Sequence, residues 1–149
     1  MQVFEVSAGR FVLSLSLGEK LIETLRRFAV ERQIGAGVIR GLGASRNAEL
    51  AYYLMDEKRY DPIPVAGFTE VVSLMGNVSL REDGEPLVHL HATLGRRDGS
   101  TVVGHVLEIE VGATLEIDLE VLPGRLSRKL DREIGLPLLA GHEGACGEP

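Results

Sequence analysis

The sequence is short of the residues that bind soft metals and form disulfides. It has one cysteine, Cys146, and no tryptophan, and its aromatic side chains are limited to four phenylalanines and three tyrosines. A single cysteine excludes an internal disulfide and any thiolate cluster within one chain. A metal ion bound by this chain must therefore be held mainly by nitrogen and oxygen ligands.

Long apolar runs and an excess of basic charge are also missing. No window of about 20 residues is free of charge, which excludes a membrane-spanning helix. The first residues show no basic stretch followed by an apolar run, so we expect no export signal and a cytoplasmic protein. Sixteen lysines and arginines face 22 acidic residues, and the net charge of −6 opposes a polyanionic partner such as DNA.

The most basic local cluster of the sequence does not change this conclusion. It lies in residues 124–133, where Asp131 and Glu133 are interspersed with the basic residues, so the pattern favours the solvated face of a helix. The basic members of this segment are Arg125, Arg128, Lys129 and Arg132.

The length of 149 residues fits one domain, which we place at residues 1–140. Residues 141–149 are rich in glycine and have the composition of a disordered tail, and His142 within them is interpreted as a surface histidine.

Apolar periodicity predicts mostly strands and one long helix near the start. Residues 10–17 alternate as a half-buried strand does, and residues 19–33 carry apolar side chains at helical spacing. Two prolines favour a loop or one turn of helix at 57–67, and a short amphipathic helix is expected at 126–134. The expected class is α+β with a mainly antiparallel, hairpin-built sheet. Further strands are expected in 37–56 (two, joined around Gly43–Asn47), 68–82 (interrupted at Gly76–Asn77), 87–96, 100–112 and 114–122.

Three of the four histidines lie in two successive predicted strands. His89 and His91 are two residues apart, so their side chains project from the same face. The position of His105 depends on the connecting loop. A two-residue turn at Asp98-Gly99 sends His105 to the other face, whereas a three-residue loop, with Gly99 in the left-handed conformation, sets His105 opposite His91.

With the three-residue loop, the three imidazoles converge, and three histidines are the ligand set of many zinc sites. Three histidines with one position left open are typical of catalytic rather than structural zinc. Zn²⁺ or a similar divalent ion is therefore the expected cofactor. The alternative is that His89, His91 and His105 are ordinary half-buried strand residues that form hydrogen bonds.

Several short blocks together resemble the plants and prokaryotes conserved (PPC) family. They are Gly41-Leu42-Gly43-Ala44, Leu50-Ala51-Tyr52-Tyr53, residues 70–78 (EVVSLMGNV), His89-Leu90-His91-Ala92 and Gly104-His105. The resemblance covers about residues 10–139 and implies a compact subunit that assembles as a trimer. It also implies a metal at the three histidines, and Glu70 matches an acidic residue of the family. Glu70 could orient an imidazole or act as a base towards metal-bound water, and the alternative is an ordinary exposed glutamate of a strand.

Two functions follow as hypotheses. In the first, the chain is a metal-dependent binding protein or enzyme for a small molecule. In the second, it is a DNA-associated regulatory protein whose metal, if bound, is structural. Plant relatives join this domain to an Arg-Gly-Arg-Pro segment that enters the minor groove of DNA, and this sequence contains no such segment. Together with the acidic balance, this favours the first hypothesis.

Overall fold

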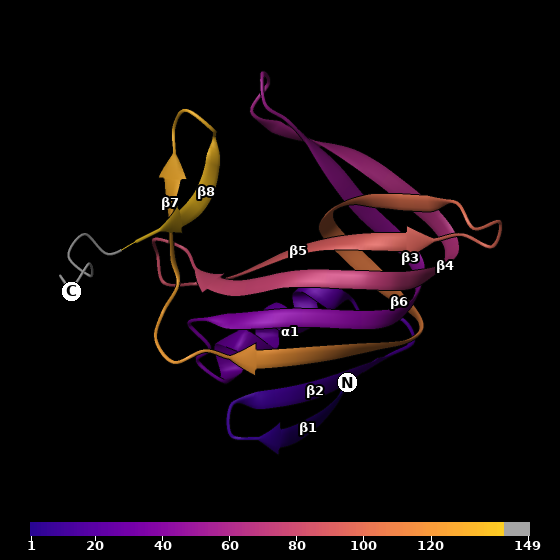
Figure 1. The fold of residues 1–149 in the computed structure, drawn as a ribbon, viewed down its shortest axis with the longest axis horizontal. Coiled ribbons are helices and arrows are strands. Elements are labelled where there is room, and N and C mark those ends of the chain that lie inside the picture. Colours follow the sequence, from indigo (N-terminus) through magenta and orange to yellow (C-terminus); the bar gives the residue numbers. More distant parts are fainter. Residues whose placement is uncertain (142–149) are drawn as a thin grey trace, which may run out of the picture.

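The structure, a computed structural model, describes residues 1–141, in which one helix packs against a strongly bent sheet (Figure 1). The predicted disordered tail and His142 lie outside the described residues, apart from Gly141. In chain order the elements are β1 (Gln2–Ser7), β2 (Arg10–Ser16), α1 (Leu21–Glu31), β3 (Gly37–Leu54), β4 (Arg59–Leu80), β5 (Pro86–Gly95), β6 (Thr101–Val121), β7 (Ser127–Asp131) and β8 (Leu136–Ala140).

The sheet runs in the order β1-β2-β6-β3-β4-β7-β8, and β5 pairs with both β4 and β6. Since β3 also pairs with both β4 and β6, these four strands form a closed circuit of pairings. All pairs are antiparallel except β4–β7, which meet in parallel at Leu80 and Ser127. The protein is thus mostly β, with a mixed but mainly antiparallel sheet.

The core lies between α1 and the sheet, as the apolar periodicity predicts. Leu21, Leu25 and Phe28 are at most 3% exposed, and they belong to one cluster with Leu13 of β2 and Leu90 of β5. Burying such side chains is the main favourable term in folding, at roughly 1.5–3 kcal/mol each. Because neighbouring residues of a strand face opposite ways, burial of Leu90 turns His89 and His91 to the face away from α1.

Two strands, β3 and β4, are longer than the sequence predicts, because each continues through a segment where an interruption is expected. β3 continues through residues 43–47 with register shifts instead of a turn, and β4 runs without interruption through Gly76 and Asn77. Pro62 and Pro64 lie inside β4, where the prediction of a loop at 57–67 was wrong. Both prolines pair with β3 only, since β5 joins β4 from Glu70 onward, so their missing N–H groups face an unpaired edge.

The predicted short helix at 126–134 was also wrong. Residues 127–131 form β7, which pairs with β8 in a hairpin. The turn is fixed by Asp131, whose Oδ1 accepts hydrogen bonds from the backbone N–H groups of Glu133 and Ile134, and by Gly135 in the left-handed region at φ 83°. A helix of nine residues is marginal alone, so this local turn chemistry decides the conformation.

Within the described residues, no helix has the length and apolar character that crossing a membrane requires. The cytoplasmic location stays a prediction.

Candidate metal centre

The loop between β5 and β6 brings the three histidines together. Arg96 donates its backbone N–H to the carbonyl of Ser100 at 2.8 Å, and Gly99 has φ 83° and donates to the carbonyl of Arg96. This is the predicted three-residue loop. It sets His91 directly opposite His105, as expected, whereas the two-residue turn would have separated them.

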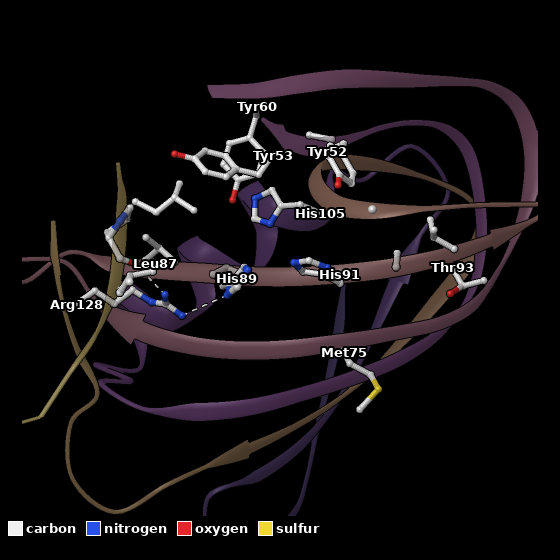
Figure 2. Close-up of a pocket in the computed structure, with 18 of the residues that line it drawn as sticks. Tyr52, Tyr53, Tyr60, Met75, Leu87, His89, His91, Thr93, His105 and Arg128 are labelled. Carbon is white, nitrogen blue, oxygen red and sulfur yellow. Dashed lines mark hydrogen bonds between the residues drawn. The ribbon is translucent and has the colours of Figure 1, made fainter. Parts of the chain in front are cut away.

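The three imidazoles form a compact triangle on the face away from α1 (Figure 2). Their ring centroids lie 5.1 to 5.4 Å apart. One nitrogen of each ring lies within 4.8 Å of the corresponding nitrogens of the other two. Nitrogens on one tetrahedral zinc ion are about 3.4 Å apart at bond lengths near 2.1 Å, so small ring rotations bring the three into bonding range.

The state of these rings suits a cation. Nδ1 of His105 is buried and has no hydrogen-bond partner among the described residues, which is a cost that a metal at this nitrogen would remove. Burial, reinforced by the neighbouring imidazoles, lowers the pKa of His105 to about 4. The pKa of His89 is lowered by burial and then by Arg128 and His91. Both imidazoles therefore stay neutral near pH 7 and keep a lone pair for a metal.

Tyrosines cover one side of the centre. Tyr60 stacks on His105, with ring centroids 4.5 Å apart and planes inclined by 20°. Tyr53, its partner across the β3–β4 pair, contacts Tyr60 edge-on at 5.1 Å. The hydroxyl of Tyr53 donates to the carbonyl of Ile134, and Lys58 Nζ donates to the carbonyl of Arg132. The ends of the β3–β4 and β7–β8 hairpins are thereby joined beside the histidines.

Arg128 of β7 contacts the centre from the other side and is only 7% exposed. Its Nε donates to Ser79 Oγ at 2.8 Å, its Nη1 to the carbonyl of Pro137 at 2.9 Å, and its Nη2 to Asn77 Oδ1 at 3.1 Å. Nη2 also lies 3.3 Å from Nδ1 of His89 (Figure 2). Burial lowers the pKa of Arg128 from a high starting value, and the group stays a cation.

The histidines open into a cavity of about 860 Å³, within the usual range of small-molecule sites. All three tyrosines of the chain line it. Aliphatic side chains from β5 and β8 complete much of the wall, including Leu87, Leu136 and Leu138. The cavity can therefore enclose the apolar part of a ligand next to a metal.

Glu70 lies apart from the centre within this chain. It is exposed, pairs with Gly95, and does not line the cavity. Gly95 is four residues along β5 from His91, a separation of about 13 Å in an extended strand. Glu70 therefore does not place its carboxylate at the histidines of the same chain, and its predicted role stays a prediction.

Sequence reasoning missed Arg128 and the tyrosine wall. It placed Arg128 on a solvated helix face, whereas the residue is buried in a strand beside His89. No local signal distinguishes it from its exposed neighbour Lys129. Tyr60 follows Glu57, Lys58 and Arg59 in a polar stretch, and only the long β3–β4 pairing brings it to His105.

Solved structures of similar proteins cover nearly the whole chain. A plant- and prokaryote-conserved (PPC) protein from Pyrococcus horikoshii is 33% identical, with a TM-score of 0.82 and 94% of each chain covered. A metal-containing protein from Archaeoglobus fulgidus is 34% identical, with a TM-score of 0.81, covering 95% of this chain and all of its own. A "putative DNA binding protein" from Bacteroides thetaiotaomicron is 26% identical, with a TM-score of 0.88, covering 93% and 96%.

No curated protein matches the sequence. A family model does match, over residues 4–123, which is most of the chain and includes all three histidines of the centre. The chain belongs to the family of the Plants and Prokaryotes Conserved (PCC) domain.

Proposed function

We propose that this chain is a metal-dependent binding protein or enzyme for a small molecule. His89, His91 and His105 hold the divalent ion, with zinc as the first candidate. The observation that carries the proposal is the convergence of three imidazole nitrogens within 4.8 Å at the wall of a cavity of about 860 Å³. A relative of 34% identity is a metal-containing protein, which supports the same interpretation.

The residues around the histidines suit a site that both holds an ion and admits a ligand. Three protein ligands leave a position open, and an ion in such a site supplies Lewis acidity. Tyr60 shields one face of His105 from water. The neutral state of His89 and His105 avoids competition between protons and the metal near pH 7.

The test is the metal content of protein purified without a histidine tag. We expect one divalent ion per chain in the parent protein by elemental mass spectrometry, and less than a tenth of that in His91→Ala. The matched control is His142→Ala, which removes the fourth histidine of the chain and should leave the metal content unchanged. A parent protein without stoichiometric metal would contradict the proposal.

The second candidate is a DNA-associated regulatory protein in which the metal is structural. What favours it is that two similar structures are each described as a "putative DNA-binding protein". The net charge of −6 weighs against it, because contacts with phosphates dominate DNA affinity. A salt titration on duplex DNA separates the two candidates. We expect no binding at low ionic strength, and binding that weakens steeply with salt would favour the second candidate.

We also propose that the chain assembles as a homotrimer, as its family resemblance implies. Large apolar side chains exposed on the single chain support an association surface, and they include Leu42 (59% exposed), Val72 (61%) and Met75 (60%). These three line one shallow depression on the surface. Sedimentation equilibrium should give about 49 kDa, three times the 16.2 kDa of one chain. A mass near 16 kDa would contradict the trimer.

A further inference from the structure

The cavity concentrates positive charge in a chain whose overall charge is negative. Arg81 and Arg128 line it, and no aspartate or glutamate is among its lining residues. In residues 1–141, none of the ion pairs involves Arg128, although this residue is only 7% exposed. A buried cation without a counterion is costly, and a divalent ion beside it would add to the repulsion.

The contact between Arg128 and His89 changes when His89 binds a metal. In the structure, Arg128 Nη2 donates toward Nδ1 of His89, which requires a lone pair on that nitrogen. A neutral imidazole has one lone pair. If Nδ1 binds the metal, the lone pair is used, and if Nε2 binds it, Nδ1 carries the proton and becomes a donor itself. In either case Arg128 loses an acceptor.

An occupied centre thus leaves a guanidinium N–H facing the cavity next to a cation. Its other bonds, to Ser79, Asn77 and the carbonyl of Pro137, hold the guanidinium in place, so it cannot turn away to water without breaking them. The group that suits this position accepts hydrogen bonds and carries negative charge. The remaining wall, made of tyrosines and aliphatic side chains, suits an apolar body.

We infer that the ligand of this cavity is a small carboxylate with an apolar body, and that Arg128 recognises its carboxylate beside the metal. This inference rests on the proposed metal-dependent function and names its ligand class. Arg128 lies in the β7–β8 hairpin, outside residues 4–123 that match the family model. Zinc and carboxylate bind cooperatively, because metal binding removes the acceptor of the Arg128 N–H on His89 and the carboxylate then accepts that N–H.

Calorimetric titration of the zinc-loaded, untagged full chain tests this inference, with benzoate as the probe and benzamide as its neutral counterpart of the same shape. We expect benzoate to bind at least tenfold more tightly than benzamide. Arg128→Gln should weaken benzoate binding by about 10- to 100-fold, the usual effect of losing a charged hydrogen bond. The matched control is Lys129→Gln, which removes the same charge from an exposed position on the same hairpin and should change benzoate binding less than about twofold.

A second readout separates recognition from a merely structural role. Arg128→Gln should raise zinc affinity by about 2- to 10-fold, because it removes a competing hydrogen bond and a like charge. Weaker binding of both zinc and benzoate would instead assign Arg128 a structural role and overturn the inference. If the glutamine variant fails to fold, zinc and benzoate affinities are compared in Arg128→Lys instead. This variant keeps the positive charge and loses the planar guanidinium.

The other possible results of these titrations would each overturn a specific part of the inference. Equal binding of benzoate and benzamide, or full benzoate binding by Arg128→Gln, overturns the inference while the metal site stands. Inorganic phosphate that binds more tightly than benzoate, and depends on Arg128, overturns the carboxylate class. If the parent protein takes up no zinc, the proposed function itself fails, and the zinc measurement shows this before any ligand is added.

Discussion

Burial of His105 should make the metal-free protein lose stability on mild acidification. The pKa of His105 falls from 6.5 to about 4 on folding, chiefly through burial and then through His89 and His91. The folded state therefore binds fewer protons than the unfolded state between these two values. Stability from this residue is complete above pH 6.5 and is lost as the pH falls toward 4. Between pH 7 and pH 5 the loss is about 2 kcal/mol from this residue alone.

The assay is urea denaturation of metal-free protein followed by far-ultraviolet circular dichroism, since the chain has no tryptophan to report by fluorescence. We expect His105→Gln to lose about 2 kcal/mol less than the parent between pH 7 and pH 5. His89, whose pKa is also lowered, adds a loss in the same direction in both proteins, so the difference isolates His105. An identical pH dependence in parent and variant would refute the reasoning that His105 is held neutral by the fold.

Three further predictions concern the strands that carry the centre, each measured as the free energy of unfolding in urea. Gly76→Ala should destabilise by about 3 kcal/mol or more, because a Cβ at this position would lie 1.8 Å from the carbonyl oxygen of His89; a loss below about 1 kcal/mol would contradict the close approach of β4 and β5. Gly99→Ala meets no neighbouring atom within 4 Å and should cost only about 1 kcal/mol, through its positive φ, whereas a neutral effect would argue against the bulged loop. Leu50→Ala, at a fully buried position, should cost about 2–5 kcal/mol, and a smaller effect would place Leu50 outside the core.

The histidine centre could be predicted because its determinants are local. The spacing of His89 and His91 puts them on one face of a strand, and a five-residue connection decides between two registers for His105. Gly99 adopts the left-handed conformation that selects the productive one. The amphipathic helix could be predicted for a related reason, since its buried positions repeat every three to four residues.

The rest of the site depends on contacts between residues far apart in sequence. Arg128 and Asn77 are 51 residues apart, and Tyr60 reaches His105 only because β3 and β4 pair along their whole length. The full length of β4 was not predicted because of its two prolines, since a proline fits in a strand only where one edge of the strand is unpaired. The amphipathic pattern at 126–134 suggested a helix because short segments fit both periods, and the Asp131 turn was not recognised.

Anomalous X-ray scattering at the zinc edge, from crystals of untagged protein loaded with zinc, tests whether the three histidines bind a metal ion. We expect one peak per chain, about 2.1 Å from a nitrogen of each of His89, His91 and His105. A loaded crystal without that peak, or with zinc bound elsewhere while the three imidazoles contact only protein, would contradict it.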